Sequence, residues 1–435
     1  MSSILTNNGA MVALQTLKAV NKNLATTQNE ISTGKSVASA RDNAAVWAIS
    51  KVMESDVKGF RGISDSLSLG ESTVAVAQNG AETVADLLTQ IKGKIVSAQE
   101  ENVDRAKIQT DIVALRDQIS SVVGAAQLNG LNLLSNRQAT AGSGSIDVLS
   151  SLDRKPDGSV TVSHISIAKQ DLGIQSTDWT TGTAAAAGSG ATISGALDAA
   201  AAVTLTGAAT APTTSLVIDS VAAGTGVQIN ITGAAGAVGA AFNDSARAVS
   251  YVARDGDTQA DVANALAKAF NDRVAAAIEA GTLASGSSLK AAVSVASGGA
   301  ATVTFTGETG AGNDMSLQAI ETSGVTIGGG LEGLTSIDVS TAAGARTALN
   351  DIEGLIQTAI DASASFGSTR GRIETQSEFV SKLSQSLKSG IGALVDADME
   401  EASARLQALQ TQQQLAVQSL SIANQAPQTI LSLFR

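Results

Sequence analysis

The most informative absences in this chain of 435 residues concern the side chains that catalyse reactions and bind metals. The chain has no cysteine and a single histidine, His164, so it can form no disulfide and cannot supply the two histidines of a helical zinc-protease motif. Only 2% of its residues are aromatic, so any core must be built mainly from Ala, Val, Leu and Ile. No cluster of His, Cys or carboxylates stands out, and we expect no catalysis, no metal and no cofactor.

Basic clusters and long apolar runs are also missing. The formal charge is −12, whereas a surface that binds nucleic acid needs clustered Lys and Arg. No run approaches the roughly 20 apolar residues of a membrane span. Residues 1–13 have neither the basic nor the apolar region of a cleaved signal peptide. We expect no nucleic-acid or membrane partner, and we expect any export to use a route other than a cleaved signal.

The strongest positive pattern occupies residues 395–435. Apolar or small residues alternate there at spacings of four and three, the heptad pattern of a helix that buries one narrow stripe against other helices. The residues in this pattern are Val395, Met399, Ala402, Leu406, Leu409, Gln413, Ala416, Leu420 and Ala423, with Leu431, Leu433 and Phe434 beyond them. Gln is frequent around the pattern, where a solvated helix usually carries Glu and Lys. The segment is therefore predicted to pack among neighbours on more than one side.

A second heptad pattern lies near the other end, at about residues 4–32. Its expected stripe is Ala10, Leu14, Leu17, Leu24 and Ile31, with Asn21 and Gln28 on the same face. Polar residues within such a stripe lower stability and can fix register and partner choice. Gly34 is expected to end the helix.

The flanking regions also read as helical. We expect one long helix at about residues 42–99, bent or broken near Gly59 to Gly70, because each glycine costs about 1 kcal/mol in a helix interior. A further helix is expected at 103–127, followed by a turn at Asn129-Gly130. Helical periodicity returns from about residue 341 to 390.

Between these helical regions the composition changes to Gly, Ala, Ser and Thr with short β-branched runs. Pro156-Asp157-Gly158 predicts the turn of a β-hairpin. Strands are expected at 203–206, 216–218, 227–231, 293–295 and 303–306, and one helix at about 258–280. We interpret the middle as one or two small α+β modules.

The fold class is therefore mainly α at both ends, with a coiled-coil-like terminal pair and an inserted β-rich α+β region. Three parts are expected: 1–35 with 395–435 as a terminal helical pair, 36–145 with 335–394 as a helical shell, and 146–334 as an exposed β-rich region. Each terminal segment has few large apolar residues, so an isolated pair is expected to be marginal and to fold as copies assemble. A repeated contact that does not close on itself generates a helical filament.

Residues in both terminal regions resemble bacterial flagellin, the subunit of the flagellar filament, and look closest to its alphaproteobacterial members. The matching N-terminal residues are Leu24, Ile31-Ser32-Thr33-Gly34-Lys35, Ala40-Arg41-Asp42-Asn43-Ala44-Ala45, Ala48-Ile49-Ser50, Ile108-Gln109, Ile112, Leu115, Ile119 and Leu128-Asn129-Gly130-Leu131. The matching C-terminal residues are Leu420, Ala423-Asn424-Gln425-Ala426-Pro427-Gln428 and Ile430-Leu431. The resemblance covers about residues 1–140 and 335–435.

The resemblance implies a secreted, extracellular structural protein of the bacterial flagellum that serves motility. Its terminal helices would form the filament core, and subunits would pass unfolded through a type III export apparatus. The implied partners are further copies of the chain, the flagellar cap and junction proteins, and an export chaperone at the C-terminal segment. A hook–filament junction protein, which shares the terminal motifs, is the alternative function.

We predict that eleven residues form the assembly interface. They are Leu14, Leu17, Leu24, Ile31, Arg41, Asp42, Met399, Leu406, Leu409, Leu420 and Leu433. Arg41 and Asp42 are either ion-pair residues between the core and the shell or simply the start of a helix. The resemblance favours the ion pair, because the family motif places these residues at the hinge between core and outer shell. The stripe residues could also form a bundle within one chain.

Three other motifs suggest a binding site but are better explained by ordinary structural roles. Gly34-Lys35-Ser36 ends like a phosphate-binding loop but lacks the first glycine and the preceding strand. Asp255, Asp257 and Asp261 have loose calcium-ligand spacing but are better explained as a helix cap. His164 is expected on a surface strand.

Overall fold

The computed structural model describes residues 7–155, 157–185, 192–198, 202–232, 236–242, 249–279 and 281–433. They group into two compact units. Unit 1 comprises residues 1–65, 151–162 and 376–435, and unit 2 comprises 66–150 and 163–375. The three-part division expected from the sequence stays a prediction.

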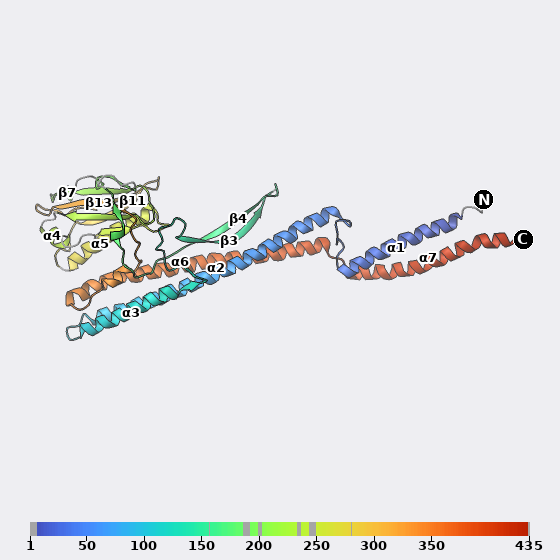
Figure 1. Cartoon of the computed structure of the whole chain (residues 1–435), viewed down its shortest axis with the longest axis horizontal. Coiled ribbons are helices and arrows are strands. Elements are labelled where there is room, and N and C mark those ends of the chain that lie inside the picture. The colour runs from blue at the N-terminus through green and yellow to red at the C-terminus, as the bar shows by residue number, and fades with distance from the viewer. Residues whose placement is uncertain are drawn as a thin grey trace. The chain divides into compact units, whose positions relative to one another are not determined.

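Long helices occupy both ends of the chain (Figure 1), which confirms the expected helical ends and β-rich middle. The helices are α1 (Asn8–Thr33), α2 (Ala44–Ser97), α3 (Arg105–Ala125), α6 (Ala342–Val395) and α7 (Met399–Leu433). The Asn7 side chain caps α1 by accepting from the Ala10 N–H. Gly34, with φ of 67°, ends α1 as predicted, because glycine adopts this left-handed conformation without steric strain.

The expected break between Gly59 and Gly70 is absent, because α2 runs unbroken for 54 residues. Its glycines serve close packing instead. A Cβ atom at Gly70 would lie 2.7 Å from Cγ2 of Val148, and one at Gly59 would lie 3.2 Å from Cδ1 of Leu152. The glycines thus give strand β3 (Ser145–Arg154) room against the helix, at a loss of helix propensity that the packing offsets.

Two hairpins follow the turn chemistry in the sequence. Asn129 and Gly130, both with positive φ, connect β1 (Gln127–Leu128) to β2 (Leu131–Asn132). β3 pairs with β4 (Val160–Ala168) across the predicted Pro-Asp-Gly turn, where Gly158 has a φ of 86°. Pro156 itself lies outside the described residues.

The middle of unit 2 is a β-rich module with two main sheets. One has the order β10-β9-β13-β5, with β7 also paired to β13, and the other has the order β11-β12-β8-β6. The strands are β5 (Thr183–Ala184), β6 (Ile193–Ser194), β7 (Val203–Leu205), β8 (Thr213–Ile218), β9 (Gly226–Thr232), β10 (Val249–Val252), β11 (Lys290–Val295), β12 (Ala301–Thr306) and β13 (Met315–Ser323). The five expected strands are confirmed.

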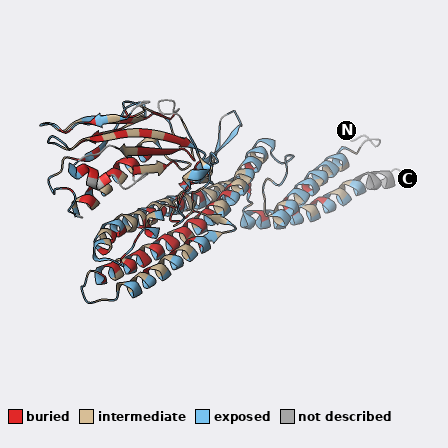
Figure 2. Cartoon of the chain, turned by 60° about the vertical axis from the view of Figure 1, so that its left-hand side comes forward, coloured by how far each residue is buried: buried red, intermediate tan, exposed pale blue. Residues whose placement is uncertain are grey.

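Helix α5 (Gln259–Glu279) packs against strands of both main sheets, and α4 (Gly236–Phe242) packs on α5. Phe270 stacks on Phe242 and meets Phe305 edge to face, with ring centroids 5.5 and 5.2 Å apart. Figure 2 shows buried residues along α5 and the strands that it covers. The module therefore has a core of its own. Short 3-10 helices, η1 (Trp179–Thr181) and η2 (Glu332–Thr335), lie where the chain enters and leaves it.

Candidate assembly interface

Helices α1 and α7, both in unit 1, lie side by side (Figure 1). They run antiparallel, because the start of α1 meets the far part of α7. At that end the Asn7 side-chain amide donates to the Ala423 carbonyl oxygen at 2.8 Å. At the other end the Ala397 N–H donates to the Gly34 carbonyl oxygen at 3.0 Å, and Lys35 forms a β-bridge with Asp396. The two terminal helices that were predicted to pack together therefore do so within a single chain.

The α7 side of this contact, which we call the inner seam, follows the predicted heptad. Ala402, Leu409 and Ala416 are 6%, 7% and 9% exposed. Leu406 and Leu420 are half-buried beside them. Small residues in the seam let the two backbones approach but bury little apolar area, so each Leu carries a large share of the contact.

The α1 side of the inner seam is partly different from the prediction. Leu17, Leu24 and Ile31 are half-buried, but the most buried residues are Val20 and Thr27 at 8% and 2% exposure. Asn21 and Gln28, expected within the stripe, are exposed and flank it. Val20 and Thr27 complete the spacings of three and four from Leu17, Leu24 and Ile31, so the polar residues expected in the stripe lie one position away from its buried centre. Asn21 still contacts α7, because its side-chain oxygen accepts from the Gln413 side-chain amide at 2.7 Å.

The remaining predicted interface residues do not belong to the inner seam. Leu14 and Met399 are each 43% exposed. Arg41 is exposed, and the Asp42 carboxylate accepts hydrogen bonds from the Ser39 N–H at 2.9 Å and the Ser39 hydroxyl at 3.0 Å. These bonds lower the pKa of Asp42 and close a local turn before α2, and the ion pair between core and shell stays a prediction. The side chain of Leu433 lies outside the described residues.

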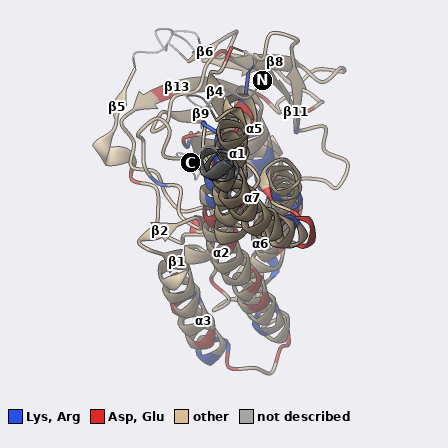
Figure 3. Ribbon diagram, turned by 90° about the vertical axis from the view of Figure 1, so that its right-hand side faces the viewer, with Lys and Arg blue, Asp and Glu red and all other residues tan. Residues whose placement is uncertain are grey.

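The outward side of α7 is uncharged beyond its first two turns and carries apolar residues among Gln, Ser and Thr. Its charged residues, Glu400, Glu401 and Arg405, lie in the first two turns, and none occurs from Leu406 to Leu433 (Figure 3). Ala408, Leu415 and Ile422 are exposed and recur every seven residues, and we call them the outer stripe. Six residues turn a helix by about 600°, so Leu415 lies about 120° around the helix from Leu409.

The outer stripe was not predicted, although its spacing is visible in the sequence. Leu415 and Ile422 are 57% and 69% exposed, as are Met11 and Val12 of α1 at 57% and 64%. A solvated surface tolerates single apolar residues, but their regular recurrence on an uncharged stretch of helix is unusual for a fully solvated surface. The pair α1–α7 therefore has one seam occupied within the chain and a second, exposed face that carries these apolar residues.

The other suggestive motifs have structural roles. Lys35 follows a helix end rather than a strand, so the phosphate-loop hypothesis is wrong. The Asp261 carboxylate accepts from the Thr258 N–H at 2.8 Å and caps α5, as expected. Asp257 accepts from the Arg254 N–H at 2.8 Å. Among the described residues no three His, Cys, Asp or Glu side chains are placed to hold a metal ion. No described helix has the length and apolarity of a membrane span.

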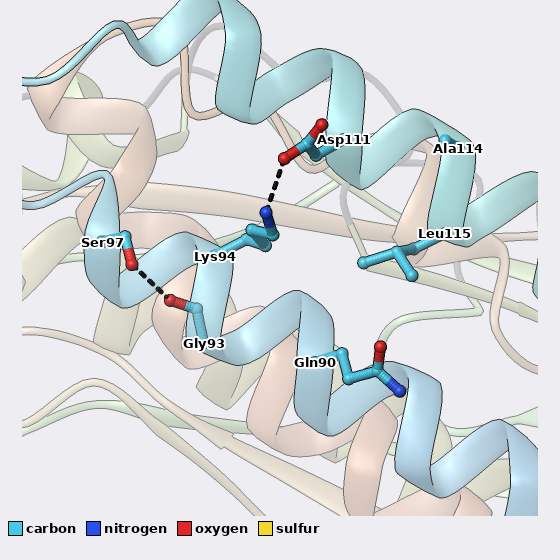
Figure 4. A pocket seen from close by; sticks show the side chains of 7 residues that line it. All are labelled: Gln90, Gly93, Lys94, Ser97, Asp111, Ala114 and Leu115. Atoms are coloured by element: carbon cyan, nitrogen blue, oxygen red, sulfur yellow. Dashed lines mark hydrogen bonds and ion pairs between the residues drawn. The ribbon is translucent and has the colours of Figure 1, made fainter.

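A hollow of about 610 Å³ lies between α2 and α3 in unit 2 (Figure 4). Lys94 of α2 reaches across it to Asp111 of α3, with Nζ and Oδ2 2.5 Å apart. The Ser97 hydroxyl donates back to the Gly93 carbonyl at 3.0 Å, and Leu115 closes the other end. Lys94, Asp111 and Ser97 are thus engaged in contacts with other lining groups, and none of them is an activated nucleophile.

Asp351 of α6 is an exposed residue whose carboxylate is nevertheless partly desolvated by its neighbours. This desolvation raises its pKa above the ordinary 3.8, the carboxylates of Asp272 and Glu279 raise it further, and Lys268 opposes them. The folded chain therefore binds this proton more tightly than the unfolded chain. Ionised Asp351 destabilises the fold at pH 7, and this penalty disappears as the pH falls through the folded pKa.

We expect Asp351→Asn to raise the free energy of unfolding at pH 7 and to have no effect well below pH 3.8. Asp338→Asn is the matched control, because hydrogen bonds from the Ser340 N–H lower the pKa of Asp338. That variant should lose stability at pH 7 instead. Urea unfolding followed by circular dichroism over a pH series measures both. An Asp351→Asn variant that is destabilised at pH 7 would contradict the prediction.

Comparisons with known proteins agree with the arrangement of the two ends. The family described as bacterial flagellin N-terminal helical region matches residues 4–139, and the bacterial flagellin C-terminal helical region matches residues 349–434. Flagellin A of Rhizobium meliloti is 36% identical over 450 residues, covering 100% of both chains. Flagellin FljK of Caulobacter vibrioides is 28% identical, covering 100% of this chain and 99% of that protein.

Solved structures are more distant. FliC of Burkholderia pseudomallei matches 70% of this chain and 99% of its own, at 16% identity and a TM-score of 0.29. FlgL of Xanthomonas campestris matches 78% of this chain and 99% of its own, at 13% identity and a TM-score of 0.34. The family matches at both ends and the full-length identity to a flagellin together decide the assignment: the chain belongs to the bacterial flagellin family.

Proposed function

We propose that this structural subunit of the bacterial flagellar filament polymerises through the pair α1–α7. In this proposal the inner seam joins the two helices of one subunit, and the outer stripe of α7 packs against neighbouring copies. Eight of the eleven predicted interface residues divide accordingly. Leu17, Leu24, Ile31, Leu406, Leu409 and Leu420 act within the pair, and Leu14 and Met399 act between subunits.

The observation that carries this proposal is the outer stripe on an uncharged helix. A helix with one apolar seam can bury that seam against a single partner helix, whereas a helix with two seams needs partners on two sides. Leu415 and Ile422, both more than half exposed in the single chain, would each contribute about 1.5–3 kcal/mol when buried. Helices with so few large seam residues gain most of their order from such packing, so folding of the pair would be coupled to assembly.

The same surface supports the finer parts of the function. The exposed apolar residues of an otherwise uncharged α7 would make it prone to premature association inside the cell, which supports binding of an export chaperone at the C-terminal segment. Helices that order only on assembly suit a subunit that leaves the cell unfolded, through a type III apparatus, and polymerises outside under the flagellar cap. The junction proteins would meet the first subunits through equivalent helices.

Electron microscopy of the purified monomer after addition of a kosmotropic salt tests the proposal. The full chain should form long filaments, and a chain lacking residues 399–435 should form none. The truncated chain should keep the circular-dichroism signal of the β-rich module, whose core contains no residue of α7. Filaments from the truncated chain, or none from the full chain even with filament seeds, would contradict the proposal.

A further inference from the structure

The chain enters and leaves the β-rich module at one place in unit 2, where four backbone segments meet. We propose that Asp171 and Arg254 form a buried polar clasp there, which holds the module in one orientation on helices α2 and α3. The segments are residues 133–144, 168–175, 251–257 and 325–331. This inference does not depend on filament assembly, because every group involved belongs to unit 2 of a single subunit.

Asp171 connects three of these segments. Its side chain is 3% exposed. One carboxylate oxygen, Oδ2, accepts from the Asn136 N–H at 3.1 Å. The other, Oδ1, accepts from the Gly173 N–H at 2.9 Å and the Gly330 N–H at 3.3 Å. The charge thus ties the segment that enters the module to the one that leaves it.

Arg254 connects the clasp to the β-rich module, because it lies between β10 and α5. Its side chain is 17% exposed, with Nε 3.7 Å from Oδ2 of Asp171. One guanidinium nitrogen donates to the Gly328 carbonyl at 3.2 Å. The other donates to the Tyr251 hydroxyl at 3.1 Å, which in turn donates to Asp257 at 2.8 Å. The fork of the guanidinium therefore links the exit segment to β10 and, through the Tyr251 hydroxyl, to the turn that precedes α5.

Asp255 adds a second connection beside the first. Its carbonyl oxygen accepts from the Asn136 side-chain amide at 3.0 Å. Its carboxylate accepts from the Gly144 N–H at 2.6 Å. The turn between β10 and α5 is thus bonded on two sides to the segment that follows β2.

Glycines allow the backbones to cross this closely. A Cβ atom at Gly144 would overlap the carbonyl of Asp255, and one at Gly330 would overlap the carbonyl of Asp171. Any other residue at these positions would push the segments apart. The close approach of the segments therefore depends on these glycines as well as on the charged pair.

The segment that holds Asn136 is anchored in the helical part of unit 2. Leu133 and Leu134 are 1% and 0% exposed. A Cβ atom at Gly80 of α2 would lie 2.7 Å from Cδ1 of Leu134. The Asn132 amide donates to the Val123 carbonyl near the end of α3 at 2.7 Å. Force on the module would consequently be transmitted through the clasp to α2 and α3.

A buried charge that loses its partner is strongly unfavourable, so either half of the pair can disrupt the clasp. Because the chain has no cysteine, Ser121→Cys on α3 and Ser294→Cys on β11 provide two unique, exposed sites for spin labels. The distance distribution between the labels, measured on the full-length monomer by pulsed electron spin resonance, reports the orientation of the module.

We expect a narrow distribution in the labelled parent and a distribution broadened at least about twofold by Arg254→Met. Asp171→Asn, which keeps the side-chain volume, should broaden it similarly, and Arg254→Lys should do so less. Lys290→Met removes an exposed cation from the module and is the matched control, with no broadening expected.

Unchanged narrow distributions in Arg254→Met and Asp171→Asn would overturn the clasp. Circular dichroism shows whether the module stays folded in each variant. If Arg254→Met unfolds the module, Asp171→Asn decides the question. Unfolding of the module in both variants would also overturn the proposal, because the pair would then be part of the module's own core rather than its attachment.

Discussion

Leu409→Asp abolishes filaments while the β-rich module stays folded. Leu409 is 7% exposed in the inner seam, and Asp would lose about 1.5–3 kcal/mol of burial and place a carboxylate among apolar residues. A loss of about 3 kcal/mol per subunit raises the critical concentration for assembly more than about a hundredfold. Leu406→Asp and Leu24→Asp act on the same seam and should have the same effect.

Sedimentation of polymer, with electron microscopy of the pellet, measures this result. Leu409→Met is the matched control, because a swap that conserves volume in a packed site usually costs less than about 1.5 kcal/mol. It should assemble at a concentration near that of the parent. Filaments of parental yield from Leu409→Asp would show that the seam between α1 and α7 is not required.

The double variant Leu415→Asp with Ile422→Asp should also lose filaments, but for a different reason. Both residues are exposed in the single chain, so their replacement leaves the contacts between α1 and α7 and the stability of the monomer unchanged. Only the contact with a neighbouring copy would lose its apolar residues and gain two carboxylates in each subunit. The expected loss is at least as large as for Leu409→Asp.

This second result separates assembly from an intramolecular bundle. Leu415→Met with Ile422→Leu keeps the stripe apolar and should assemble normally. Thermal unfolding of the monomer checks that the charged double variant is as stable as its parent. Normal filaments from the charged double variant would mean that the outer stripe is ordinary surface and that the proposed contact lies elsewhere.

The sequence determined the parts of this protein that depend on local geometry. The repeat of Leu17, Leu24 and Ile31 and the heptad through Leu409 predicted two terminal helices, because helical spacing places such residues on one side. Gly34 and Asn129-Gly130 predicted a helix end and a tight turn, since few residues other than glycine and asparagine adopt the required backbone angles. The two terminal helices, the helix end at Gly34 and the turn at Asn129-Gly130 are found as predicted.

Where several explanations fitted the same residues, the tertiary contacts decided between them. Gly59 and Gly70 were expected to bend or break α2, which runs unbroken, and the structure shows that they make room for β3, a segment some eighty residues later. Strand β13 pairs with three others, yet its alternation of Met315, Leu317 and Ala319 was not recognised as a strand. A short alternation of apolar residues forms a strand only where neighbouring strands pair with it and pack against its side chains.

The division between local and tertiary information is clearest at the interface and at the clasp. The spacing of the seam residues is repeated along one helix, so it can be recognised from that stretch of sequence alone. Which residues face α1 and which face outward depends on where the partner helix lies, and so Val20, Thr27 and the outer stripe emerged only from the structure. Asp171 and Arg254 are 83 positions apart, with no repeat between them to relate the two. Their pairing arises because a closed module must begin and end at neighbouring points, where backbone groups removed from water need partners.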